Sequence, residues 1–137
     1  MIRDLYDNSI VAYKTGTEQT VNLVTETIKL AKKKEKVTAE LQLHSDQGFQ
    51  YTSNAYFNLT KEYDITPSMS RRGNCYDNAM AENFFGILKS ECINRQKIKD
   101  FAMAKSLIYE YIDFYNNQRI QLKTKLTPLE KRCQYVV

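Results

Sequence analysis

Short strand-type segments alternate with amphipathic helical segments along this chain, and that order restricts the possible folds more than any other feature. Segments rich in Ile, Val, Leu and Tyr predict strands at residues 1–6, 10–14, 41–46 and 65–69. Apolar residues at helical spacing predict helices over roughly 18–34, 53–63, 78–93 and 100–116, with a short one from Pro128. The order β-β-α-β-α-β-α-α predicts a mixed α/β fold whose helices cover the sheet.

Turn and capping residues mark the ends of several of these segments. Asp7-Asn8-Ser9 is a turn-forming cluster between the first two strands and predicts a hairpin. Thr17 is the expected N-cap of the first helix, and Thr127-Pro128 has the N-cap and first-turn proline that open the terminal one.

Composition favours an ordinary globular protein, with 42% hydrophobic and 26% charged residues in 137. No apolar run is long enough for a membrane span, and residues 1–6 do not resemble a secretory signal. The cysteines Cys75, Cys92 and Cys133 have neither disulfide-framework nor zinc spacing, which indicates a reduced, cytoplasmic setting. A net charge of +4 permits a polyanionic partner without requiring one.

Two acidic residues stand out by position. Asp46 ends a predicted strand beside Gly48, where the chain can turn sharply and leave a carboxylate open. Glu82 lies with Lys89 on a helix face opposite the apolar stripe of Met80, Phe84, Ile87 and Leu88. Taken alone, a plain turn and a solvated helix face explain the two acids better than a catalytic site does.

Longer motifs resemble a known family. The segments 44–48 (HSDQG), 68–85 (SMSRRGNCYDNAMAENFF) and 115–119 (YNNQR) resemble bacterial insertion-sequence transposases, which are related to retroviral integrases and have a ribonuclease-H-like fold. Asp46 and Glu82 are separated by 35 residues, the spacing typical of this DDE superfamily. The resemblance covers essentially the whole chain and implies a truncated catalytic core at 1–117 and a C-terminal tail with a short helix at 118–137.

The resemblance implies metal-dependent phosphoryl transfer on DNA during transposition. In this family three carboxylates hold two Mg²⁺ (or Mn²⁺) ions, and Asp46 and Glu82 would be the second and third of them. The implied DNA contacts are Lys89, Arg71, Arg72 and Asn78, the arginines in a loop over the site. The implied partners are DNA and further copies of the chain, at the bacterial nucleoid in the cytoplasm, with neither a membrane nor a small-molecule substrate.

The family's first aspartate lies on a strand upstream of the hairpin, and residues 1–6 match the second strand. We therefore expect a sheet that lacks a central first strand, and a chain that is inactive alone. Asp4 and Asp7 could replace the missing ligand, although turn chemistry explains them better. A catalytically dead DNA-binding or dimerising module is the alternative function. A ribonuclease-H-like nuclease of another kind is disfavoured by the Arg71–Glu82 motif and the tail.

Overall fold

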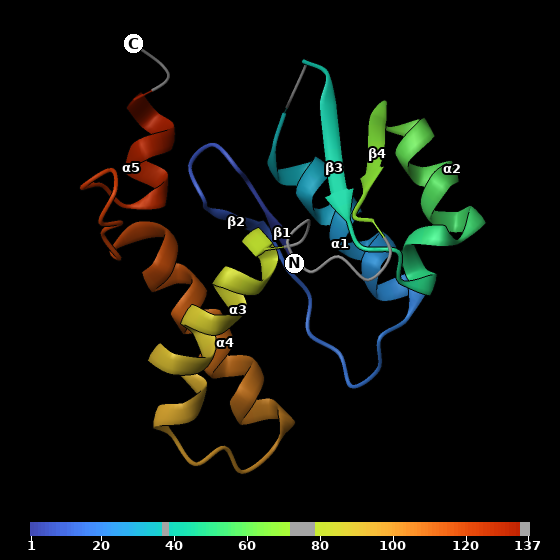
Figure 1. The fold of residues 1–137 in the computed structure, drawn as a ribbon. Helices are drawn as coiled ribbons and strands as arrows, with labels where there is room; N and C mark the ends of the chain where they lie inside the picture. The colour runs from blue at the N-terminus through green and yellow to red at the C-terminus, as the bar shows by residue number, and fades with distance from the viewer. Residues whose placement is uncertain (37–38, 72–78, 135–137) are drawn as a thin grey trace. The chain divides into compact units, whose positions relative to one another are not determined.

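The computed structural model describes residues 1–36, 39–71 and 79–134. Its elements follow the expected order (Figure 1). They are β1 (Ile2–Arg3), β2 (Ile10–Ala12), α1 (Val21–Lys34), β3 (Leu41–Ser45), α2 (Asn54–Glu62), β4 (Ile65–Met69), α3 (Ala79–Glu91), α4 (Phe101–Asn117) and α5 (Pro128–Cys133), with 3-10 turns at Phe49–Thr52 and Ile93–Arg95.

The chain divides into two compact units. The first contains Met1–Ile2 and Val11–Ala79, and the second contains Arg3–Ile10 and Met80–Val137. The terminal helix α5 thus belongs to the same unit as α3 and α4. The expected division of the chain at residue 117 stays a prediction.

In the first unit, β3 and β4 form a parallel pair. Leu41 is aligned with Ile65 at one end and Ser45 with Met69 at the other. Parallel strands need a crossover between them, and α2 provides it. The carboxyl ends of both strands therefore lie at the same edge of the pair, directly before Asp46 and Ser70.

Helices α1 and α2 pack on this strand pair around a small apolar core. Ile28 of α1 and Tyr56 and Leu59 of α2 are buried at its centre. Leu43, Ile65 and Met69 of the strands pack against them, as do Ile2, Val24, Tyr51 and Tyr63. Side chains of β3 alternate, so that Leu43 is half-buried where Gln42 and His44 are exposed.

The first helix begins three residues later than the sequence predicted. Its N-cap is Thr20, whose Oγ1 accepts the Leu23 N–H at 3.1 Å, so the expected cap at Thr17 is wrong. The apolar periodicity of the helix begins at Val21, and the residue directly before it is the one that can reach the first-turn amides. The expected cap at Thr127 is confirmed, with a full capping box to Glu130.

In the second unit, aromatic side chains join α3 to α4. Phe84 and Tyr115 are each only 1% exposed, and their rings meet edge to face with centroids 5.0 Å apart. Asn116 of α4 accepts the Ile10 N–H and donates to the Ile10 carbonyl, which attaches the start of β2 to this helix.

The expected turn between β1 and β2 is confirmed, and an ion pair fixes it. Asn8 has a left-handed φ of 68°, and Asp7 Oδ1 accepts the Ser9 N–H at 2.7 Å. Asp7 is 1% exposed, and its Oδ2 accepts from Arg132 Nε at 2.7 Å. Arg132 also donates to Ser9 Oγ and reaches Asp4, so α5 is held to the hairpin turn.

A second ion pair links the end of α3 to the segment after α4. Arg119 donates from Nε to both oxygens of Glu91 and from Nη2 to Oε2, and Tyr111 donates to Glu91 Oε1. The Arg119 guanidinium holds the pKa of Glu91 below its ordinary value of 4.5. Burial, and then the Glu91 carboxylate, raise the pKa of Tyr111.

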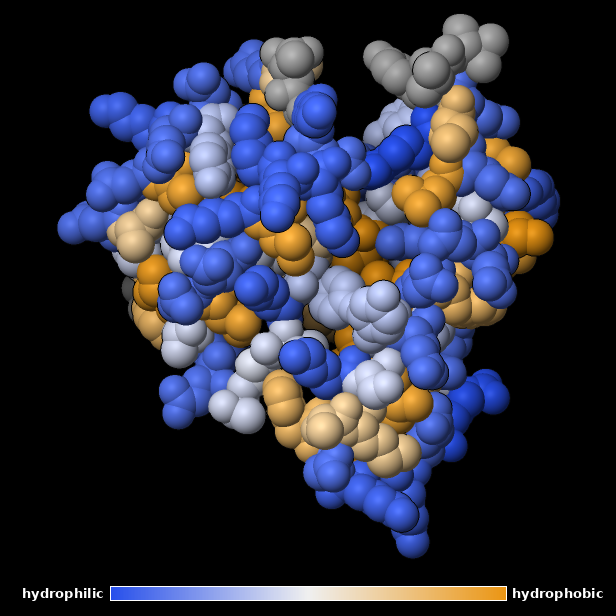
Figure 2. Space-filling model, turned by 180° about the vertical axis from the view of Figure 1, so that it is seen from behind, coloured by the Kyte–Doolittle hydropathy of each residue, from blue (hydrophilic) through white to orange (hydrophobic). Residues whose placement is uncertain are grey.

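The described strands form two separate two-stranded sheets, β1–β2 and β3–β4. A single mixed sheet would need a strand that pairs with both, and the described ranges contain none. Figure 2 shows hydrophobic side chains interspersed among hydrophilic ones on the face drawn. Among the large hydrophobic residues of the described ranges, Leu122 is the most exposed, at 86%. Within these ranges, too, no helix is long and apolar enough to cross a bilayer.

Arg132→Met is expected to lower the free energy of unfolding by about 3 kcal/mol, because it leaves the buried Asp7 carboxylate without its cation. Chemical denaturation of the two proteins measures the difference. Adding Asp7→Asn to the variant removes the unpaired charge and should recover part of the loss. Equal losses in the single and double variants would contradict this role of the ion pair.

Glu91 is expected to make stability depend on acid pH. Because its pKa is lower in the folded chain, its contribution is fully present above the ordinary pKa of 4.5 and is lost as the pH falls through the folded value. The difference in unfolding free energy between the wild type and Glu91→Gln should therefore shrink below pH 4.5. A difference that stays constant down to about pH 2 would show that Glu91 is not stabilised as an anion.

Candidate active site

Asp46 lies directly after β3, at the carboxyl end of the parallel pair. Its side chain is exposed, and its Oδ1 accepts the Gly48 N–H at 2.7 Å. A Cβ on Gly48 would lie 2.9 Å from that oxygen and 2.8 Å from Gln50 Oε1. A side chain at this position would therefore displace these two side-chain oxygens, although the backbone φ of −57° is open to any residue. The turn presents one oriented carboxylate to solvent.

Ser70 lies across from Asp46, directly after β4, and forms hydrogen bonds with the residues on both sides of Asp46. Its N–H donates to the Ser45 carbonyl at 2.7 Å, and its own carbonyl accepts from Gln47 Nε2 at 3.1 Å. Its Oγ lies 3.0 Å from His44 Nε2, while His44 Nδ1 lies 2.9 Å from Ser68 Oγ. The backbone that carries Asp46 is therefore tied to the end of the neighbouring strand.

The Asp46 carboxylate affects the pKa of the neighbouring Tyr51. Burial raises the pKa of Tyr51, and the Asp46 carboxylate raises it further. Tyr51 also packs edge to face on the buried ring of Tyr56, with centroids 5.4 Å apart. The turn after Asp46 is thereby attached to the core of the first unit.

Glu82 lies in the first turns of α3, in the second unit. Its side chain and that of Lys89 are exposed, whereas Phe84 and Leu88 are buried, as the helical pattern predicted. Met80, assigned to the same apolar stripe, is instead 44% exposed, because it lies in the first turn, before the stripe enters the core.

Arg3 holds the helix turn that carries Glu82, a role that sequence reasoning missed. Its guanidinium donates to the Met80 carbonyl at 2.6 Å, to Asn83 Oδ1 at 3.2 Å and to the Tyr115 hydroxyl at 2.9 Å. These acceptors lie before and after Glu82 in the sequence, and on α4. The pairing of a strand arginine with a carbonyl 77 residues away leaves no local sequence signal.

The predicted site residues fall on both units. Asp46 and Arg71 belong to the first unit, and Glu82 and Lys89 belong to the second. The predicted DNA contacts Arg72 and Asn78 lie outside the described residues.

The donor chemistry of Asp46 and Glu82 fits a hard divalent cation, since both offer exposed carboxylate oxygens. Across residues 1–36, 39–71 and 79–134, however, no group of three or more His, Cys, Asp and Glu side chains could share a metal ion. Asp4 and Asp7 are engaged by the hairpin turn and Arg132, in keeping with their interpretation as turn residues. The two predicted carboxylates are therefore the candidate metal ligands.

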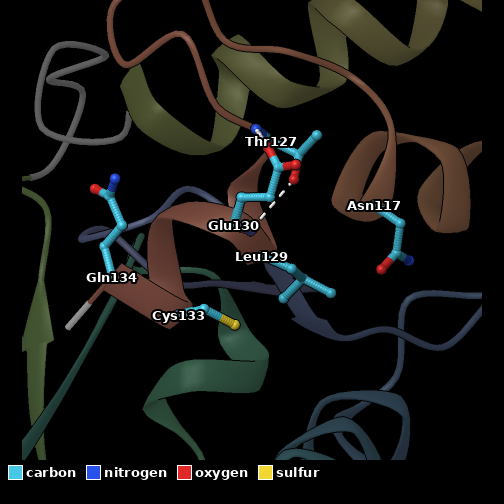
Figure 3. Close-up of a pocket in the computed structure, with 6 residues that line it drawn as sticks. All are labelled: Asn117, Thr127, Leu129, Glu130, Cys133 and Gln134. Atoms are coloured by element: carbon cyan, nitrogen blue, oxygen red, sulfur yellow. Dashed lines mark hydrogen bonds between the residues drawn. The ribbon is translucent and has the colours of Figure 1, made fainter. Parts of the chain in front are cut away.

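A pocket beside α5 contains none of the predicted site residues (Figure 3). It has a volume of about 440 Å³ and is lined by Asn117, Thr127, Leu129, Glu130, Cys133 and Gln134. Its one carboxylate, Glu130, accepts the Thr127 N–H at 2.8 Å as part of the capping box. The acid that lines this pocket thus stabilises the start of α5.

Sequence comparison identifies relatives along the whole chain. Two family models, each described as an integrase core domain, match residues 1–75 and 82–135. The putative transposase of insertion sequence element IS150 from Escherichia coli is 44% identical over 132 residues, which are 96% of this chain and 47% of that protein. The transposase of IS904 from Lactococcus lactis is 37% identical over 85% of this chain and 47% of its own length. The chain thus spans about half the length of these curated relatives.

Solved structures with the same fold include retroviral integrases. A chain of a simian T-cell lymphotropic virus intasome superimposes with a TM-score of 0.74 at 16% identity, over 93% of this chain and 45% of its own. The catalytic core domain of BIV integrase gives a TM-score of 0.67 at 24% identity, over 90% and 77%. The ribonuclease-H-like fold is thereby confirmed. By sequence, the chain belongs to the integrase core domain family.

Proposed function

We propose that the chain acts in DNA transposition, as the part of a catalytic core that supplies the second and third metal-binding carboxylates. The observation that carries this proposal is the exposed Asp46 carboxylate, oriented by the Gly48 N–H at the carboxyl end of β3. In an integrase-family chain, such a residue 35 positions before an exposed helical glutamate, Glu82, fits the DDE pattern.

In this proposal the residues of the chain bind and orient the reacting groups. Asp46 and Glu82 would hold Mg²⁺ or Mn²⁺, which when bound activates the attacking hydroxyl and stabilises charge on the phosphate. Arg3 keeps the first turn of α3 in place, so that Glu82 projects from a fixed helix. Lys89, about two helical turns further along the same face of α3, would contact the DNA backbone together with Arg71, Arg72 and Asn78.

The chain by itself is proposed to be inactive. The two-metal arrangement of this family needs a further carboxylate, and the described residues hold no cluster of three potential ligands. The proposed partners are the DNA of transposon ends and target and further copies of the chain. Action on chromosomal DNA would place the protein at the nucleoid, in the bacterial cytoplasm.

A DNA-binding or dimerising module without catalysis is the second candidate, and the net charge of +4 favours it. Such a module would bind DNA through its cations alone. Its affinity would depend on salt and would be indifferent to Asp46→Ala and Glu82→Ala.

Strand transfer of a pre-cut DNA end in Mn²⁺ tests the catalytic proposal. The chain as given is expected to be inactive. A version extended upstream by a strand carrying an aspartate is expected to be active, because the third ligand is then present. Asp46→Asn and Glu82→Gln should each abolish that activity.

The matched control is the same extension with its aspartate replaced by asparagine, which restores the strand but not the ligand. Activity in the unextended chain that disappears on Asp4→Ala would instead make Asp4 the missing ligand. Unchanged activity in Asp46→Asn would refute the proposed role of Asp46.

Lys89→Ala is expected to weaken DNA binding regardless of sequence and to reduce the salt slope, d log K/d log [salt], by about 1, because one phosphate contact is lost. Fluorescence anisotropy over a salt series measures this slope. Lys105→Ala, which removes an exposed lysine from α4, is the matched control. The same change in slope for both variants would show that Lys89 contributes only general charge.

A further inference from the structure

Ser70 forms three hydrogen bonds with residues on either side of Asp46. Its backbone N–H bonds to residue 45 and its backbone carbonyl to residue 47, the two neighbours of Asp46. Its hydroxyl bonds to His44 Nε2, one residue further back. Ser70 is itself only 4% exposed, so this bonding takes place at the buried end of β4. Three separate bonds from a single residue thus restrain the short segment around the carboxylate.

We propose that Ser70, held by His44, is a positioning residue that fixes Asp46 for metal binding. The two backbone bonds set the path of the chain through Asp46, and the Oγ–Nε2 bond sets the rotamer and place of Ser70. The Gly48 N–H then orients the carboxylate at Oδ1. This inference rests on the proposed metal-binding role of Asp46.

His44 has two serine partners, but they differ in what they hold. Ser68 Oγ, on Nδ1, lies within β4 at the position aligned with His44 itself. Ser70 Oγ, on Nε2, belongs to the residue whose backbone brackets Asp46. Of these two bonds, the one to Nε2 is therefore the one that transmits position to the carboxylate. The same geometry ties the start of the segment that carries Arg71 to the site.

The difference between the two nitrogens provides matched variants of the full chain. Ser70→Ala removes the hydroxyl that bonds to His44 Nε2, and Ser68→Ala removes the hydroxyl that bonds to Nδ1 of the same imidazole. His44→Gln places an amide nitrogen near the position of Nε2, whereas His44→Asn places one near Nδ1. The readouts are amide hydrogen exchange of Gly48 and Mn²⁺ affinity. Neither readout requires catalysis.

Ser70→Ala and His44→Asn are expected to speed Gly48 exchange about fivefold, as the loss of one hydrogen bond would. They should also weaken Mn²⁺ binding about 10-fold or more, as removing a group that orients a metal ligand does. Ser68→Ala and His44→Gln should remain close to wild type in both. Exchange of the buried Leu59 amide in α2, unchanged in all four variants, shows that the unit stays folded.

Unchanged Gly48 exchange in Ser70→Ala would overturn the proposal. If Asp46→Asn weakens Mn²⁺ binding, a Ser70→Ala variant with faster Gly48 exchange but unaltered Mn²⁺ affinity would overturn it as well. Failure of the proposed function gives a different result. If Asp46→Asn leaves Mn²⁺ affinity unchanged, Asp46 is not a metal ligand. The proposed role of Ser70 in positioning a metal ligand is then also refuted, whatever Gly48 exchange shows.

Discussion

The parallel pairing of β3 with β4 is the constraint on which the candidate site depends. Because the strands run in the same direction, their carboxyl ends meet at one edge, and the residues that follow them face each other. Asp46 follows β3 and Ser70 follows β4, so the polar groups at this edge can bond across the two strand ends. The crossover helix α2 provides the buried Tyr56 and Leu59 that keep the pair in register against α1. The parallel β3–β4 pair therefore determines both the packing of the first unit and the geometry around Asp46.

Glu82 depends on a different set of interactions. Its helix is held by the Phe84–Tyr115 contact inside the second unit and by the Arg3 guanidinium at the first turn. Arg132 and Asp7 in turn fix the hairpin next to Arg3. A buried carboxylate paired with an arginine contributes mainly because either partner alone would be costly in this place. The helix face left exposed is the one that carries Glu82 and Lys89.

The two carboxylates lie on separate compact units, each with its own apolar core and polar contacts. Catalysis of the kind proposed needs both of them on the same metal ions, together with a further ligand. The described strands form two separate pairs, with no strand that joins them.

The sequence by itself determined the order of elements, the family, and Asp46 and Glu82 as candidate ligands, because periodicity, capping residues and long motifs are local in the chain. It missed the start of α1 by three residues, since several threonines precede that helix and only the folded turn shows which one reaches the amides. Tertiary structure alone revealed the contacts of Ser70 with His44 and Gln47, and of Arg3 with the turn of Glu82. These contacts join residues 23 to 80 positions apart, and such pairings are decided by how strands and helices pack.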